Sequence, residues 1–289
     1  MHAHELDIDI RLVQRLISIQ FPQWACLPLA RIESAGTMNA IYRLGTEMAV
    51  RLPRVEEALK DVEKEWRWLR RLASALPVPI PVPLAKGEPT DDYPWPWSVT
   101  RWLRGETPVV GRLTDPRALA KDLGQFVHAL HRVDATRGPS SYRGVHLAAR
   151  DAPTRTAIAE LHGIIDRDAA TAAWEAALRV PAWTGPPVWI HADLSPGNVL
   201  VSGGRLAAVL DFGAVGLGDP AVDAIAAWNL LPENARDTFR EALAIDDATW
   251  ARARGWALSI ALIQLPYYRI TNPVLADNAV HVIGTICNP

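Results

Sequence analysis

The chain has 289 residues, of which 49% are hydrophobic and 21% are charged, so it can form one large domain or two lobes that share a cleft. A net charge of −2 gives no reason to expect nucleic acid or an anionic membrane as a partner. The two cysteines lack metal or disulfide spacing, and no apolar run suits a signal peptide or approaches the roughly 18 residues of a membrane span. We therefore expect a cytoplasmic protein and a monomer.

The first 52 residues predict a helix followed by three strands. Apolar residues recur at helical spacing over residues 6–19, and strands are predicted over 27–33, 40–44 and 48–52. The turn between the first two strands has small and hydroxyl-bearing residues whose backbone N–H groups could cover the phosphates of a nucleotide. An ordinary hairpin turn has a similar composition, so the turn alone leaves both interpretations open. Its candidate residues are Ser34, Gly36, Thr37 and Asn39.

Residues 57–76 predict a long amphipathic helix. Glu65 lies within its apolar stripe and could face Arg51 on the preceding strand. The stripe is formed by Leu59, Val62, Trp66, Leu69 and Leu72.

A proline-rich segment then crosses to the last strands of a first lobe. Every second residue from Pro77 to Pro83 is proline, which excludes a helix and favours an extended, polyproline-like path. Strands are predicted near 84–86 and over 97–103. The pattern breaks at Arg104-Gly105-Glu106, where we expect a hinge.

The second part of the chain is predicted to be mainly helical. Residues 135–145 are rich in Gly, Ser and Arg and predict a loop. We expect the helix after residue 248 to be interrupted at Pro266. The predicted helices cover residues 115–133, 152–180 (two helices divided near Asp166), 219–230, 233–243, 248–265 and 273–286.

One stretch, residues 188–223, carries three polar groups at positions that suit phosphoryl transfer. Asp193 lies in a loop between two short apolar runs, Asn198 lies where the chain re-enters a strand, and Asp211 follows a hairpin at Gly203-Gly204. Moving a phosphoryl group requires a carboxylate beside the attacking hydroxyl and hard oxygen ligands for magnesium. Asp193 can provide the first function, and Asn198 and Asp211 can provide the second.

The wording of this stretch resembles the aminoglycoside phosphotransferase family. His191-Ala192-Asp193 with Asn198 matches the H-x-D-x-x-x-x-N loop of kinase-like enzymes, and Asp211-Phe212-Gly213 matches their magnesium motif. The resemblance implies an α+β, bilobal, protein-kinase-like fold, with a sheet-rich nucleotide-binding lobe over residues 1–103. A larger helical lobe over residues 104–289 would then bind the acceptor and carry out catalysis.

The same resemblance assigns roles to individual residues. Asp193 would orient the acceptor hydroxyl or accept its proton, and Ser195 would contact the moving phosphoryl group. Asn198 and Asp211 would hold Mg²⁺. Arg51 would bind the phosphates of ATP or GTP in place of the family's lysine, paired with Glu65, while Arg54 is the alternative cation. The turn at Ser34–Asn39 would cover the phosphates, Thr100 would be the gatekeeper, and the backbone of Arg101 and Leu103 would bind the purine edge.

The acceptor is less well specified than the reaction. Residues 181–289 hold ten acidic and six basic side chains, and this net charge of −4 favours a cationic aminoglycoside antibiotic, which implies a resistance function. A macrolide or a small metabolic alcohol is the alternative. The replacement of lysine by Arg51 also leaves open a nucleotide-binding protein without catalysis.

Overall fold

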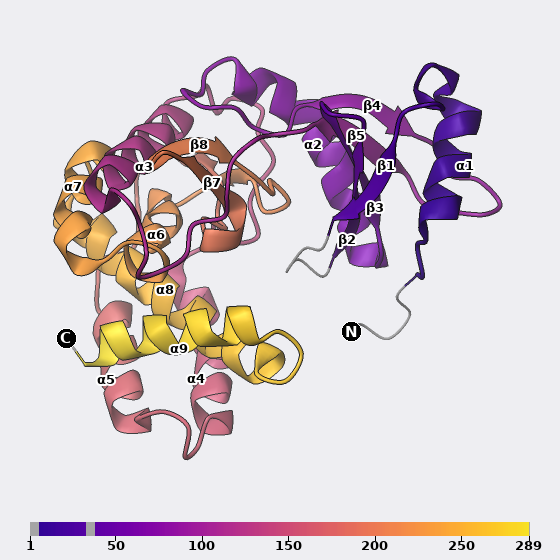
Figure 1. Cartoon of the computed structure of the whole chain (residues 1–289). Coiled ribbons are helices and arrows are strands. Elements are labelled where there is room, and N and C mark those ends of the chain that lie inside the picture. The colour runs from indigo at the N-terminus through magenta and orange to yellow at the C-terminus, as the bar shows by residue number, and fades with distance from the viewer. Residues whose placement is uncertain (1–5, 33–37, 289) are drawn as a thin grey trace. The chain divides into compact units, whose positions relative to one another are not determined.

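The computed structural model describes residues 6–32 and 38–288 and separates the chain into two units (Figure 1). The first unit contains Met1–Ala75, Pro79–Gly105 and Ala208–Gly213, and the second contains Leu76–Val78, Glu106–Ala207 and Ala214–Pro289. The first unit is organised around a sheet and the second is mainly helical, so the predicted α+β class is confirmed. The nucleotide-binding and acceptor-binding roles of the two lobes stay predictions.

Five antiparallel strands form the sheet of the first unit, in the order β1-β2-β3-β5-β4. The strand β3 lies in the middle, so it is hydrogen-bonded on both sides and holds Arg51 on a rigid support. The strands are β1 (Leu29–Ile32), β2 (Asn39–Leu44), β3 (Met48–Pro53), β4 (Pro83–Gly87) and β5 (Trp97–Arg101).

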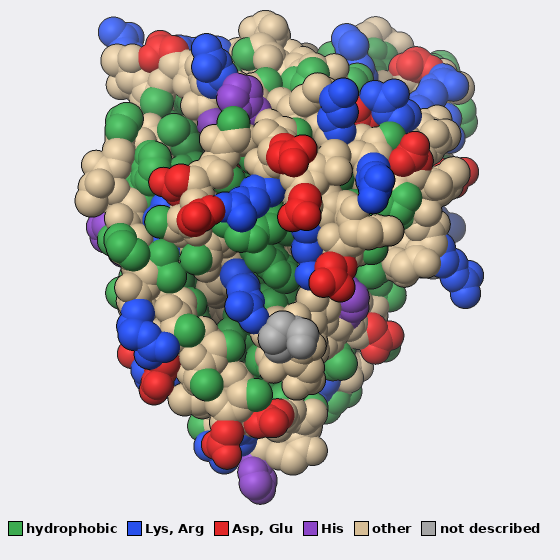
Figure 2. Space-filling model, turned by 90° about the vertical axis from the view of Figure 1, so that its left-hand side faces the viewer, with side chains coloured by type: hydrophobic (Ala, Val, Ile, Leu, Met, Phe, Trp, Pro, Cys, Tyr) green, Lys and Arg blue, Asp and Glu red, His purple; other side chains and the backbone are tan. Residues whose placement is uncertain are grey.

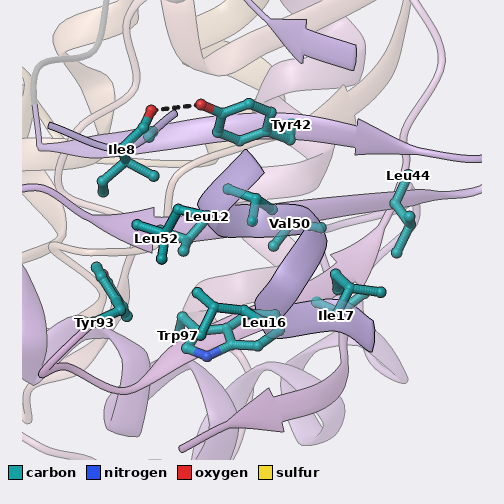
Figure 3. Packing of buried hydrophobic residues seen from close by; sticks show 13 residues of the cluster. Ile8, Leu12, Leu16, Ile17, Tyr42, Leu44, Val50, Leu52, Tyr93 and Trp97 are labelled. Carbon is teal, nitrogen blue, oxygen red and sulfur yellow. Dashed lines mark hydrogen bonds between the residues drawn. The ribbon is translucent and has the colours of Figure 1, made fainter. Parts of the chain in front are cut away.

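The helix α1 (Ile10–Gln20) packs its apolar face on this sheet (Figure 3). It begins later than its apolar pattern suggests, because the Asp9 carboxylate accepts a hydrogen bond from the Leu12 N–H at 2.7 Å and caps the first turn. The Tyr42 hydroxyl donates to the Ile8 carbonyl at 2.6 Å, which fixes the chain just before the helix. Full burial of each large side chain here stabilises the fold by about 1.5–3 kcal/mol. The cluster includes Leu12, Val13, Leu16, Ile17, Tyr42, Val50, Leu52 and Trp97.

The helix α2 (Leu59–Ala73) follows a short 3₁₀ turn, η2 (Glu56–Ala58). Its buried stripe contains Glu65, as expected, but it contains Trp68 in place of Trp66. The Trp66 ring instead lies on the partly exposed side, where the Arg70 guanidinium stacks 4.2 Å from the ring centroid. The cation–π contact stabilises the ring at the surface. A tryptophan that fits the apolar spacing of a helix is therefore not always buried in the core.

The second unit is built on the helix α8 (Asp247–Tyr268), which contacts several of the other helices. The helices α4 (Asp151–Glu160), α5 (Arg167–Leu178) and α9 (Pro273–Cys287) pack against it (Figure 1). The division between α4 and α5 falls at Asp166, which caps α5 as predicted. Elsewhere in the unit, α3 (Pro116–His131) packs on α7 (Glu233–Leu243).

The predicted break at Pro266 is wrong, because α8 continues through this residue to Tyr268. Proline lacks one N–H donor, but Pro266 lies in the last turn of the helix, where only one intrahelical bond is lost. The helical bond from the Arg269 N–H to the Leu265 carbonyl, 3.0 Å long, forms on the far side of the proline. No helix in the described ranges has the length and the apolar composition that crossing a membrane requires.

Short strands and 3₁₀ turns carry the polar stretch of residues 188–223. The strand β6 (Val188–Ile190) pairs with β9 (Gly216–Gly218), and β7 (Val199–Ser202) pairs with β8 (Arg205–Val209). Both Gly203 and Gly204 have positive φ, at 57° and 78°, which is the backbone that a tight two-residue hairpin needs. The turn η4 (Pro196–Asn198) precedes β7, and η5 (Pro220–Ile225) and α6 (Ala226–Asn229) follow β9.

Candidate functional site

Asp193 lies in the loop that leaves β6, and the side chain of Asn198 holds it in place. The Asn198 Nδ2 donates to the Asp193 backbone carbonyl at 2.9 Å and to the Asp193 carboxylate oxygen Oδ2 at 3.1 Å. The turn η4 brings the two residues together, because the Asn198 N–H also bonds to the Ser195 carbonyl at 3.0 Å. The carboxylate is thus oriented by a neutral amide and keeps 32% of its side-chain surface exposed.

Asp223 holds the backbone of this loop through hydrogen bonds. Its carboxylate accepts hydrogen bonds from the N–H groups of His191 and Ala192, at 3.0 and 2.7 Å. It also contacts the His131 Nε2 at 3.1 Å. These bonds give Asp223 a structural role in holding the loop, with His131 as a further partner. They hold Ala192 at a φ of +66°, a backbone that residues with a Cβ rarely adopt.

Arg143 lies in another segment but contacts this loop, and the sequence did not predict it. Its Nη1 donates to the Ala192 carbonyl at 2.9 Å and to the Asp193 carboxylate oxygen Oδ1. Burial by itself would raise the pKa of Asp193, but the Arg143 guanidinium, with smaller contributions from His191 and the Asn198 amide, lowers that pKa below its ordinary value. Asp193 is therefore an ionised carboxylate at neutral pH.

Ser195 lies two residues after Asp193 in an extended conformation, at φ −134° and ψ 165°, just before the turn η4. Its side chain is partly exposed. This position agrees with a polar contact near Asp193, although the predicted role toward a phosphoryl group stays a prediction.

In the first unit, Arg51 joins the second set of predicted residues. The Arg51 Nη1 donates to the Glu65 carboxylate at 2.7 Å, so the expected strand–helix ion pair is present. The Arg51 Nη2 lies 3.8 Å from the Asp211 carboxylate. Burial would lower the pKa of Arg51, but Glu65 and Asp211 together raise it, so the guanidinium stays charged. Burial raises the pKa of Glu65, whose Oε1 lacks a hydrogen-bond partner within the described residues.

Two further charged residues of α2 hold the Asp211 loop and were not predicted. The Lys64 Nζ donates to the Gly213 carbonyl and lies 3.2 Å from the Asp61 carboxylate. A Cβ on Gly213 would lie 2.8 Å from the Asp61 Oδ2, so a side chain here would require the Asp61 carboxylate to shift. Burial raises the pKa of Asp61, and the Lys64 ammonium partly offsets this. This cluster holds three carboxylates and two cations, so one negative charge is left unbalanced. A bound metal ion could balance it.

The predicted nucleotide contacts are only partly described. Ser34, Gly36 and Thr37 lie outside the described residues, while Asn39 begins β2 and pairs with Pro53. Thr100 is fully buried in β5.

The purine-edge prediction needs one refinement. The Arg101 N–H already donates to the Val82 carbonyl at 3.1 Å, so this donor is used within the sheet. Leu103 lies beyond the end of β5, and the contact of either residue with a purine stays a prediction.

Asn198 and Asp211 each offer an oxygen ligand of the kind that magnesium prefers. Because the Asn198 Nδ2 is turned toward Asp193, the amide oxygen points elsewhere and can act as a ligand. Asp211 keeps 49% of its side-chain surface exposed and offers a charged oxygen. The described ranges contain no group of three or more His, Cys, Asp or Glu that could hold a metal. Mg²⁺ does not need one, because it is usually held by one or two carboxylates together with waters and substrate phosphates.

Known proteins share the family and the fold of this chain. The family model described as "Phosphotransferase enzyme family" matches residues 30–256, whereas no curated protein sequence matches the chain. Among solved structures, the GDP complex of aminoglycoside 2'-phosphotransferase-IIIa superposes with a TM-score of 0.77 at 18% identity, covering 97% of this chain and 99% of the other. The macrolide 2'-phosphotransferase MphH from Brachybacterium faecium superposes with a TM-score of 0.65 at 22% identity, covering 97% and 98%.

These structures confirm the kinase-like fold that the catalytic motifs predicted, and at such low identity they establish the fold alone. The family match covers more than half of the chain and includes Arg51, Asp193, Asn198 and Asp211. The chain therefore belongs to the phosphotransferase enzyme family.

Proposed function

We propose that this protein transfers the γ-phosphoryl group of ATP or GTP to a hydroxyl group of a small molecule. The observation that carries the proposal is the state of Asp193. It is ionised, partly exposed and held through both carboxylate oxygens, in a loop that the buried Asp223 fixes. Such a carboxylate can accept a hydrogen bond from an acceptor hydroxyl and align it for in-line attack. The solved relatives include GDP and ADP complexes, which supports a nucleotide donor.

The other predicted residues fit around this step. Arg51 would bind the nucleotide phosphates while Glu65 holds its guanidinium, and Ser195 would contact the moving phosphoryl group. In the nucleotide-binding lobe, Ser34, Gly36, Thr37 and Asn39 would cover the phosphates, and Thr100, Arg101 and Leu103 would line the base. We further propose that the protein works as a monomer in the cytoplasm. Both cysteines are free thiols, which fits a reducing compartment.

Magnesium would be held by Asn198 and Asp211. When bound, the ion neutralises phosphate charge as the phosphoryl group moves. Asp211 is suited to this, because its own partner Arg51 lies 3.8 Å away and leaves much of the carboxylate accessible.

An aminoglycoside is the first acceptor class we propose. The net charge of −4 over residues 181–289 favours a cationic ligand, and two solved relatives are complexes with kanamycin and gentamicin. On the face shown in Figure 2, however, acidic and basic side chains are interspersed. Electrostatic attraction from this charge excess would therefore be modest.

A macrolide is the second acceptor class, and one observation favours it. Arg143 contacts Asp193, while burial, with a smaller effect of Arg143, lowers the pKa of Arg150. The Arg150 guanidinium lies 5.9 Å from the Trp256 ring centroid. The Arg150 guanidinium would repel the several ammonium groups of an aminoglycoside, but a largely apolar acceptor with a single amine would meet less repulsion.

One experiment tests both the reaction and the acceptor. Purified protein would be assayed with ATP or GTP, Mg²⁺ and a panel of aminoglycosides, macrolides and small metabolic alcohols. We expect transfer to at least one acceptor, its loss in Asp193→Ala, and its retention in Asp237→Ala, which changes an exposed acid of the same unit. Nucleotide binding without transfer or hydrolysis would instead favour a non-catalytic protein. For an aminoglycoside, kcat/KM should fall as salt rises, whereas a macrolide should show a weaker dependence.

A further inference from the structure

The segment of residues 138–144, predicted only as a loop, is held against the strand β9. The Leu217 N–H donates to the Pro139 carbonyl at 2.7 Å, and the Ser141 N–H donates back to the Leu217 carbonyl at 3.0 Å. The Ser141 hydroxyl adds a bond to the Ala214 carbonyl at 2.7 Å. These bonds place the segment beside β9 much as a third strand would lie.

Two glycines set how closely the segment approaches. A Cβ on Gly218 would lie 2.1 Å from the Cα of Gly144, and a Cβ on Gly144 would lie 2.5 Å from the Leu217 carbonyl oxygen. Neither position accepts a side chain without a shift of the backbone. Arg143 directly precedes this contact, so its backbone has a fixed position relative to β9, which pairs with β6 and hence adjoins the catalytic loop.

The guanidinium of Arg143 makes a contact that is built into the fold. It donates to both the Ala192 carbonyl and the Asp193 carboxylate, and only 15% of its side-chain surface is exposed. The Tyr142 ring lies 5.4 Å from it. A shielded guanidinium is held more firmly than one on a flexible surface ion pair, and its attraction to the carboxylate is screened less by water.

A phosphoryl-transfer site has a specific need for such a cation. A carboxylate that must approach a triphosphate is repelled by it, and a neighbouring positive charge reduces this repulsion. Asn198 cannot do so, because its amide is neutral. We propose that Arg143 is a positioning residue that orients Asp193 and offsets its charge, so that Asp193 can lie close to the phosphoryl group during transfer. This inference rests on the phosphotransferase function proposed above.

The proposal predicts a defect in turnover rather than in nucleotide binding. Arg143→Gln should lower kcat about 100-fold, the scale expected when a catalytic group is misplaced, and leave the nucleotide KM nearly unchanged. Arg143→Lys should recover part of the loss, and millimolar guanidinium ion should partly rescue Arg143→Ala. The matched control is Arg155→Ala in the same unit, which removes a half-exposed arginine paired with Asp151 and Glu175 and should behave like the wild type.

The contact itself can be tested without any activity. In a double-mutant cycle on the unfolding free energy, Arg143→Ala and Asp193→Ala should be non-additive, since each removes the partner of the other. Additive effects, or an Arg143→Gln enzyme with wild-type kcat, would overturn the proposal. If the wild type transfers no phosphoryl group to any acceptor, the proposed function fails instead. A non-additive cycle would then show a contact that serves the fold alone, which would also overturn the positioning role.

Discussion

The two units hold the carboxylates of the candidate site differently. In the second unit, Asp223 is fully buried and bonded to two backbone N–H groups, and Asp193 is bound through both carboxylate oxygens. In the first unit, Asp211 is nearly half exposed, and the Arg51 guanidinium lies 3.8 Å from its carboxylate. We infer that the catalytic loop is organised in advance, whereas the charges around Asp211 are balanced only when metal and nucleotide bind.

The largest effect should come from a substitution in the charged cluster around Asp211. A bound metal supplies several kcal/mol of charge stabilisation, and each 1.36 kcal/mol is a tenfold change in rate. Asp211→Ala should therefore lower turnover about 1,000-fold with magnesium, while the melting temperature changes little because the side chain is exposed. Steady-state rates over a magnesium titration give the answer. Asp91→Ala, an exposed acid of the same unit, is the control, and a near-normal rate for Asp211→Ala would refute the metal assignment.

The preorganised unit should instead show its largest effect on stability. Arg252 and Asp219 form an ion pair at 2.8 Å in which both side chains are only 4% exposed. Removing one partner of a buried pair leaves an uncompensated charge, so Arg252→Ala should reduce the free energy of unfolding by about 3–5 kcal/mol.

The comparison for this prediction lies in the same unit. Arg240 pairs with Asp247, whose side chain is 98% exposed, so Arg240→Ala should cost less than about 1 kcal/mol. Urea denaturation measures both variants. If both variants lose the same free energy of unfolding, the buried pair adds no special stability to the second unit. The contrast between the units would then be weaker.

Arg51 combines both features, because it lies on the rigid strand β3 and its guanidinium faces the charged cluster around Asp211. A hydrogen bond to a charged group contributes about 1.5–3 kcal/mol, so Arg51→Ala should lower kcat/KM for the nucleotide about 10- to 100-fold. Arg51→Lys keeps the charge and should retain much of the activity. Initial rates at varied nucleotide concentration separate the two variants. If Arg51→Ala resembles the wild type, the phosphate cation lies elsewhere, and Arg54 is the first alternative.

The sequence identified the candidate site residues that lie within short, recognisable motifs. Asp193, Asn198 and Asp211 stand at motif spacing. Arg143 gave no such signal, because its partner Asp193 is 50 residues away and the contact depends on the Gly144–Gly218 approach. Lys64 and Asp61 lie in the predicted helix of residues 57–76 but belong to no recognised motif. Their contact with Gly213 depends on how the chain folds back over about 150 residues, which periodicity cannot show.

The smallest effect should separate strain from function within the preorganised loop. Ala192 and Ala244 both adopt positive φ, at 66° and 55°, but Ala244 ends α7 and only Ala192 adjoins Asp193. A left-handed backbone costs an L-residue roughly 1–2 kcal/mol, and glycine relieves this while losing about 0.5–1 kcal/mol through its greater freedom when unfolded. Ala192→Gly and Ala244→Gly should therefore each stabilise the protein slightly, by about 1 kcal/mol or less.

The kinetics of these two variants then test the loop itself. Asp223 and Arg143 bind the peptide groups on both sides of Ala192, so the loop should keep its shape without the Cβ. We expect kcat for both variants to stay within about twofold of the wild type, since neither removes a group that contacts Asp193. A large loss of kcat in Ala192→Gly alone, with normal stability, would mean that the methyl group restrains the loop. The hydrogen bonds from Asp223, Asn198 and Arg143 would then be insufficient to hold Asp193, and the second unit would be less preorganised than its bonding suggests.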